Sequence, residues 1–119
     1  MNITSGLAWV PSAFAPMYGA TKAALHSFTV AARPHYAGTN VAVVEIAPPP
    51  VKTNLPSSQA YGEPLDAFCD HAFERFTQGQ QEIGYKLSEE VRLAPREELD
   101  KKFEFMTGRS FKGPSYGQT

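Results

Sequence analysis

The first 47 residues place an extended segment, an alanine-rich segment and a β-branched segment in that order. Residues 1–5 are typical of the end of a strand, and Gly6 then allows the backbone to turn away. Pro16 suits the first turn of a helix, which the apolar spacing continues to about Tyr36. Residues 41–47 are nearly continuously apolar, as in a parallel strand that is covered on both faces. This order predicts an α/β fold with half of a doubly wound parallel sheet.

The helix that begins near Pro16 is predicted to bury one apolar stripe. Leu25, Phe28, Ala32 and Tyr36 recur at spacings of three and four, and such residues share one helical face. Pro34 removes a hydrogen bond inside a helix, so we expect the helix to kink or end near Ala32–Arg33. We expect His26 and His35 to be surface or packing residues, and we predict no metal site.

The remaining segments are predicted to pack around the same sheet. We expect a helix over residues 64–79, with Cys69 as a small buried side chain, then a short strand at 81–85 and a second helix over 95–106. Residues 54–63 have the composition of a mobile lid, and residues 107–119 that of a flexible tail. We find no internal repeat and no second domain.

Composition excludes several classes of function. The net charge is −1 with scattered basic residues, which is not the electrostatic footprint of a nucleic-acid-binding protein. The one cysteine cannot form an intramolecular disulfide. No apolar run reaches the length of a membrane span. We therefore expect a cytoplasmic protein that contacts neither membrane nor nucleic acid.

Three residues near the N-terminus form a pattern that suits proton transfer. Tyr18 and Lys22 stand four apart, so their side chains share one helical face, and Ser5 precedes Tyr18 by thirteen positions. A neighbouring ammonium favours the deprotonated form of a phenol, which makes the phenol more useful as an acid or base. The Ser5 hydroxyl can hydrogen-bond the oxygen that the phenol protonates. An ordinary solvated Tyr–Lys pair is the alternative interpretation.

Ser5, Tyr18 and Lys22, within Thr-Ser-Gly and Met-Tyr-Gly-Ala-Thr-Lys-Ala-Ala-Leu, resemble the active-site segment of short-chain dehydrogenases/reductases. The resemblance implies that Ser5 orients a substrate carbonyl, that Tyr18 transfers the proton, and that Lys22 binds the nicotinamide ribose. It also implies a partial Rossmann-like sheet, a small-molecule carbonyl or alcohol substrate, and a homodimer formed through helix 17–33. The substrate itself is not identified. It is expected to bind near Trp9, Phe14 and the 54–63 loop. The apolar residues in 7–16 could equally well line a pocket or cover the core.

A second segment, residues 48–53, resembles the Pro-Gly-x-Val-x-Thr segment with which this family contacts the nicotinamide. Pro48, Val51 and Thr53 match, and Pro49 replaces the glycine, as in the DltE-like branch of the family. Pro49 lacks a backbone N–H, so any contact made by that group is absent here. The alternatives are a rigid turn after a strand, and Thr53 as the cap of the next turn. Ser5 and residues 48–53 both follow predicted strand ends, where ligands bind in such sheets.

Residues 1–119 contain no glycine-rich turn of the kind that holds a pyrophosphate. The resemblance covers residues 1–106 and only the C-terminal, catalytic half of the family's domain, so a truncated chain is expected. NAD or NADP is the implied cofactor, with NADP preferred, although the segment that distinguishes them is absent. The two functional hypotheses are an NAD(P)-dependent oxidoreductase and a catalytically silent fragment that acts as an interaction or dimerisation module.

Overall fold

The computed structural model describes residues 1–55 and 61–107. It contains a parallel sheet of three short strands, β1 (Asn2–Ile3), β2 (Glu45–Ala47) and β3 (Glu82–Gly84), in the order β1-β2-β3. Asn2 pairs with Glu45, and Glu45 pairs in turn with Glu82. The predicted α/β fold with a partial Rossmann-like parallel sheet is confirmed.

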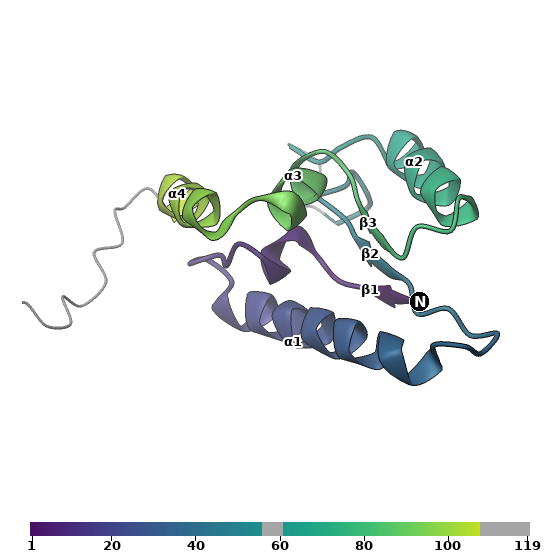
Figure 1. The fold of residues 1–119 in the computed structure, drawn as a ribbon. Coiled ribbons are helices and arrows are strands. Elements are labelled where there is room, and N and C mark those ends of the chain that lie inside the picture. Colours follow the sequence, from purple (N-terminus) through teal and green to yellow (C-terminus); the bar gives the residue numbers. More distant parts are fainter. Residues whose placement is uncertain (56–60, 108–119) are drawn as a thin grey trace, which may run out of the picture.

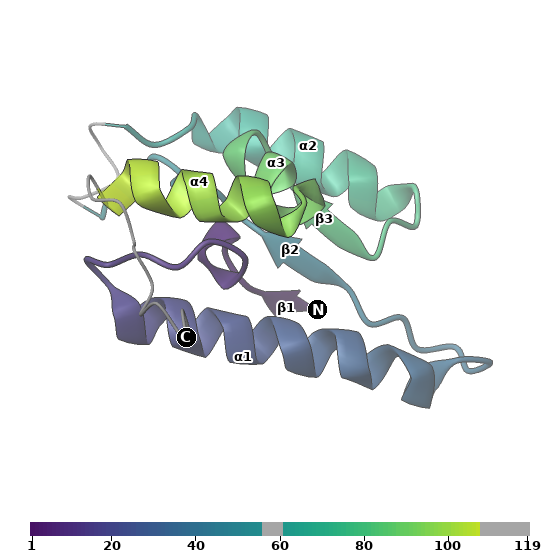
Figure 2. The same ribbon diagram turned by 60° about the vertical axis from the view of Figure 1, so that its left-hand side comes forward.

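Two helices connect the strands and lie on opposite faces of the sheet, as Figures 1 and 2 show. Helix α1 (Pro16–Ala32) joins β1 to β2, and helix α2 (Leu65–Thr77) joins β2 to β3. The strands step across the sheet in one direction while the helices change face. The two crossovers must therefore have opposite hands, and one of them is of the uncommon left-handed kind.

The two faces of the sheet differ in chemistry. On the α2 side, Ile46 and Ile83 are neighbours in register and form a core with Val44, Phe68 and Ala72. On the α1 side, the register places Asn2, Glu45 and Glu82 in a row of polar side chains. The hydrophobic core of the described residues therefore lies between the sheet and α2.

This asymmetry explains why the predicted apolar stripe of the first helix is wrong. Phe28 and Tyr36 are 64% and 44% exposed, and Thr29, which is fully buried, faces the sheet instead. Because the sheet presents polar groups on this side, the helix turns hydrogen-bonding residues inward. The Asn2 amide accordingly donates to Thr29 Oγ1 at 2.9 Å.

The predicted end of this helix is confirmed. α1 stops at Ala32, and a 3₁₀ turn, η2 (Arg33–Tyr36), contains Pro34. Arg33 Nη2 and Nε donate to the carbonyls of Gln81 and Val43 at 2.9 and 3.2 Å. The first residue after the helix thereby holds its C-terminal end against the approach to β2 and β3.

Other expectations need correction. The strand predicted over 41–47 is restricted to residues 45–47, because β1 supplies pairing only at Asn2 and Ile3. Ile3, in the opening strand, is 47% exposed. Cys69, expected to be buried, is exposed, because the hollow that it lines with Ile3 and Ile46 is open to solvent.

Three further elements lie beyond the carboxyl ends of the strands. The 3₁₀ turn η1 (Gly6–Ala8) follows β1, and helices α3 (Leu87–Leu93) and α4 (Arg96–Thr107) follow β3. Gly84 allows a close approach here, since a Cβ at this position would lie 2.7 Å from the backbone of Glu89. The strand at 81–85 and the helix at 95–106 are confirmed, with bounds of 82–84 and 96–107.

Residues 56–60 of the expected lid, and the expected tail beyond Thr107, lie outside the described residues. Among the helices that the structure describes, none combines the length and hydropathy needed to cross a bilayer.

Ile83 lies in the hydrophobic core and has no exposed surface, so truncating its side chain should strongly destabilise the fold. We expect Ile83→Ala to lower the free energy of unfolding by about 3 kcal/mol, because it removes buried methyl groups and leaves a cavity. Phe73→Ala is the control. Phe73 lies on α2 but is 69% exposed, so we expect a loss below about 1 kcal/mol. Urea unfolding followed by circular dichroism measures both, and equal losses would contradict the location of the core.

Candidate active site

A cavity of about 440 Å³ lies beyond the carboxyl ends of β1 and β2. Ser5, Tyr18 and Lys22 all line it, together with residues 48–50. Ser5 follows β1, the other two residues come from the first two turns of α1, and residues 48–50 follow β2. The three residues singled out by the sequence pattern are therefore brought to one cavity.

The side chains of Tyr18 and Lys22 lie against each other. The Lys22 Nζ is 5.6 Å from the centroid of the Tyr18 ring, within the range of a cation–π interaction. The same ammonium donates a hydrogen bond to the Ile3 carbonyl at 3.0 Å. Tyr18 is 48% exposed. The ammonium is thus held at the end of β1, and the phenol ring next to it is accessible from solvent.

Ser5 caps the turn η1. Its Oγ accepts a hydrogen bond from the Leu7 amide at 3.2 Å. A hydroxyl carries one donor and two acceptor sites, so this bond leaves the O–H of Ser5 able to donate to a further oxygen. The side chain is half-buried at the cavity wall.

The segment after β2 enters the site only in part. Pro48, Pro49 and Pro50 line the cavity, whereas Val51 and Thr53 lie outside its lining. Val51 forms a parallel bridge with Glu63. The Thr53 Oγ1 accepts a hydrogen bond from the Leu55 amide at 3.2 Å, a local turn contact. These contacts fix the backbone beyond Pro50.

The apolar residues of the 7–16 segment take different places. Leu7 and Val10 line the cavity. Trp9 packs instead on His26, with ring centroids 4.4 Å apart, and Phe14 is 84% exposed.

The opposite wall of the cavity was not anticipated from the sequence. It is formed by Leu87, Ser88 and Val91 of α3 and by Met106 of α4. The sequence predicted the helix that contains Met106 but not α3, and it gave no signal that either lies close to Ser5. That proximity depends on the close packing of α3 beside η1, where a Cβ on Gly6 would lie 3.3 Å from the Ser88 side chain.

An ion pair fixes the start of α3. Glu89 accepts two hydrogen bonds from Arg92, at 2.6 and 2.7 Å, and a third from the Gly84 amide at 3.0 Å. The hydrogen bonding from Arg92 lowers the pKa of the Glu89 carboxyl below its ordinary value, and the same contact raises the pKa of Arg92. The pair ties the cavity wall to the end of β3.

Because the pKa of Glu89 is lower in the folded chain, the pair stabilises the fold above pH 4.5, the ordinary value of the group. This stabilisation is lost as the pH falls through the lowered pKa. We expect Glu89→Gln to destabilise the chain at neutral pH and the difference from wild type to shrink on acidification. Urea unfolding at several pH values measures this. Glu97→Gln is the control, because Glu97 is an exposed partner of Lys101, and its effect should be small throughout.

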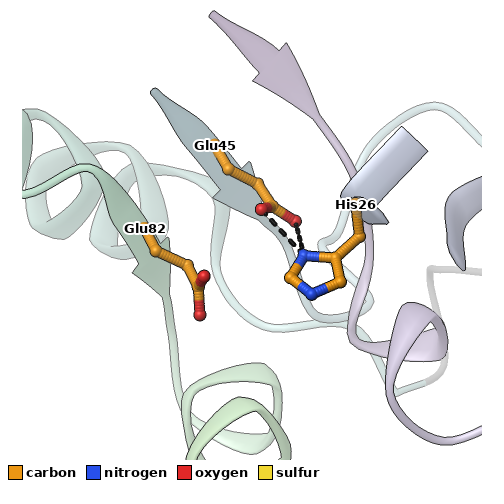
Figure 3. A group of neighbouring side chains, drawn as sticks. All are labelled: His26, Glu45 and Glu82. Atoms are coloured by element: carbon orange, nitrogen blue, oxygen red, sulfur yellow. Dashed lines mark hydrogen bonds and ion pairs between the residues drawn. The ribbon is translucent and has the colours of Figure 1, made fainter. Parts of the chain in front are cut away.

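A separate polar cluster lies on the α1 face of the sheet, where Figure 3 shows His26 and Glu45 side by side and Glu82 nearby. One possible ligand atom from each residue lies within 4.8 Å of the others. However, Arg33 lies 4.0 Å from a carboxylate oxygen of both Glu45 and Glu82. A cation of the chain itself thus compensates both acids, which favours an ion-pair cluster over a metal site. The sequence pattern did not reveal this grouping, since its members come from three elements.

The family model of short chain dehydrogenases matches residues 1–63. The chain belongs to this family. It is also 37% identical over 113 residues to the "Uncharacterized oxidoreductase DltE" of Bacillus subtilis (strain 168), a match that covers 89% of this chain and 45% of that protein. This short-chain dehydrogenase chain therefore spans about half the length of the curated relative it matches. No solved structure gives a significant match.

Members of the short-chain dehydrogenase family generally bind NAD or NADP. The donors at the cavity, which are the ammonium of Lys22 and the hydroxyls of Ser5 and Tyr18, suit a ribose and a carbonyl oxygen. Residues 1–119 contain no glycine-rich turn of the kind that holds the phosphates of such a cofactor. The residues present thus fit the nicotinamide end of a dinucleotide.

Proposed function

We propose that the chain carries the catalytic half of an NAD(P)-dependent oxidoreductase that interconverts a carbonyl and an alcohol. The observation that supports this most strongly is the convergence of Ser5, Tyr18 and Lys22 on one cavity beyond the strand ends. Chain connectivity alone does not require that convergence, since Ser5 and Tyr18 are separated by a loop and a change of element.

In this proposal each side chain has a distinct task. The O–H of Ser5 donates to the substrate oxygen and orients it. Tyr18 donates its phenolic proton to that oxygen when a carbonyl is reduced, and takes it back when an alcohol is oxidised. Lys22 binds the ribose, and its ammonium lies beside the Tyr18 ring.

The cofactor, when bound, supplies or accepts the hydride. Lys22 and Tyr18 would hold its ribose, and residues 48–50 would contact its nicotinamide. Val51 and Thr53 would contribute backbone and hydroxyl contacts as the segment continues. We propose NADP in preference to NAD, and a cytoplasmic location.

The proposed substrate is a small molecule with an apolar body. The cavity wall combines Leu7, Val10, Leu87, Val91 and Met106, which offer dispersion and hydrophobic contacts but few hydrogen bonds. The polar groups gather at Ser5, Tyr18 and Lys22, where one oxygen of the substrate would be recognised.

We expect Tyr18→Phe to reduce turnover by about 100-fold or more, because it deletes the proton donor, with a much smaller change in KM. The assay uses the chain joined to the cofactor-binding half of a family member and follows NADPH absorbance with a panel of apolar ketones and aldehydes. Tyr36→Phe is the matched control. Tyr36 is 44% exposed, close to the 48% of Tyr18, but it lies in η2, beyond the C-terminal end of α1, so turnover of this variant should be normal.

Normal turnover of Tyr18→Phe would refute the proton-transfer role.

A second measurement bears on the phosphate contacts. Without the joined half, the 119-residue chain should show weak or no NADPH binding by fluorescence. Tight binding by the chain alone would contradict the proposal that a glycine-rich half binds the phosphates of the cofactor.

A second candidate function is an interaction module that dimerises through helix 17–33. Met17, Phe28 and Val30 on α1 are 75%, 64% and 43% exposed, so the helix presents apolar side chains to solvent that a partner subunit would cover. We expect Phe28→Glu to shift the chain from dimer to monomer in sedimentation velocity experiments. Phe105→Glu, at an equally apolar but 89% exposed position on α4, should leave the dimer intact. A wild-type chain that sediments as a monomer would exclude this function.

A further inference from the structure

The carboxylate of Glu45 is fully buried at the centre of the sheet. Thr4 Oγ1 donates to its Oε1 at 2.7 Å, and His26 Nδ1 lies 2.9 Å from each of its oxygens, as Figure 3 shows for the histidine. A carboxylate only accepts hydrogen bonds, so Nδ1 of His26 carries the proton in this contact. Glu45 thus joins the end of β1 to the middle of α1.

His26 is linked to both ends of the segment that carries Ser5, directly at one end and through Glu45 at the other. At one end it binds Glu45, which binds Thr4, the residue before Ser5. At the other end its ring packs on Trp9, with centroids 4.4 Å apart. The turn that carries Ser5 therefore lies between two attachments to one histidine.

The same histidine is one helical turn from Lys22. Lys22 itself donates to the Ile3 carbonyl at 3.0 Å, so the helix holds the end of β1 at two successive turns. These two contacts help to set the relative position of Ser5 and the Tyr18–Lys22 pair, since Ser5 and Tyr18 share no element.

We propose that Glu45 and His26 are positioning residues that hold the Ser5 hydroxyl at the cavity. The role of these residues in catalysis rests on the proposed oxidoreductase function. What the structure supports directly is that they hold Ser5 in place. Neither residue lines the cavity, so they act through Thr4 and Trp9 and not on the substrate.

A general role in stability would produce different behaviour from a positioning role, and the chain offers a matched pair of variants to separate them. Thr4 and Thr29 are 2% and 0% exposed, and the hydroxyl of each makes a hydrogen bond to a residue of the sheet. Thr4 bonds Glu45 beside the site, whereas Thr29 bonds Asn2 one turn farther away. Thr4→Val and Thr29→Val remove the same group from equally buried positions.

The Leu7 amide is the reporter of Ser5, because it donates to Ser5 Oγ at 3.2 Å. Its hydrogen exchange, measured by ¹⁵N NMR on the 119-residue chain, is divided by that of the Gln78 amide, which donates to the Glu74 carbonyl at the end of α2. Both amides lie at the ends of elements, where exchange proceeds by local opening, so the ratio follows the turn that carries Ser5 and not the global unfolding to which both threonine variants contribute.

We expect Thr4→Val to raise the ratio by about ten-fold, because it removes a hydrogen bond to a buried charge. His26→Gln should raise it similarly, since it also breaks the link to the helix, and Thr4→Ser should restore the wild-type ratio because it keeps the hydroxyl. For Thr29→Val we expect a change below about two-fold.

Equal ratios for the two valine variants, an unchanged ratio in Thr4→Val, or an unprotected Leu7 amide in the wild type would each overturn the positioning role. None of these measurements depends on catalysis. If Tyr18→Phe turns over normally while the exchange results hold, the proposed function fails and the placement of Ser5 stands.

Discussion

Glu45 carries a carboxylate into the centre of the sheet, where none of its surface reaches solvent. Burying a charge costs several kcal/mol unless other groups compensate it. Here the compensation comes from Thr4 of the first strand end, from His26 of α1, and from Arg33, which lies 4.0 Å away. These groups can act together only if α1 lies across this face with its polar side inward. The orientation of the helix that carries Tyr18 and Lys22 is therefore linked to one buried acid.

The sheet separates this polar interface from an apolar one. Ile46 and Ile83 face α2 and form the hydrophobic core with their neighbours, while the adjacent positions in the same strands face α1. Because strand side chains alternate between faces, each strand contributes to both interfaces. The cavity lies where the strands end and the two interfaces meet the helices α3 and α4. A parallel sheet brings its carboxyl ends to one edge, which is why residues from distant parts of the chain of this short-chain dehydrogenase gather there.

Sequence reasoning succeeded where the signal was local. The four-residue spacing of Tyr18 and Lys22 on one helix is enough to bring their side chains together, and Pro34 marks the end of α1. It failed where a choice depended on the surface facing an element. The apolar positions around Phe28 suggested a buried stripe, but the opposing sheet face is polar, so the helix is turned with Thr29 inward. The polar residues within the predicted strand segments, Asn2, Glu45 and Glu82, were the available hint of that polar face.

The sequence by itself determined the order of strand and helix, the α/β class and the local Tyr18–Lys22 pair, because these follow from propensity and periodicity within a single element. Only the tertiary structure decided that the helices cover opposite faces of the sheet, that α3 and α4 form the far wall of the cavity, and that His26, Glu45 and Glu82 lie together. Those outcomes depend on which surfaces meet and on how a buried charge is compensated. Both involve residues far apart in the chain, whose separation in space no local pattern encodes.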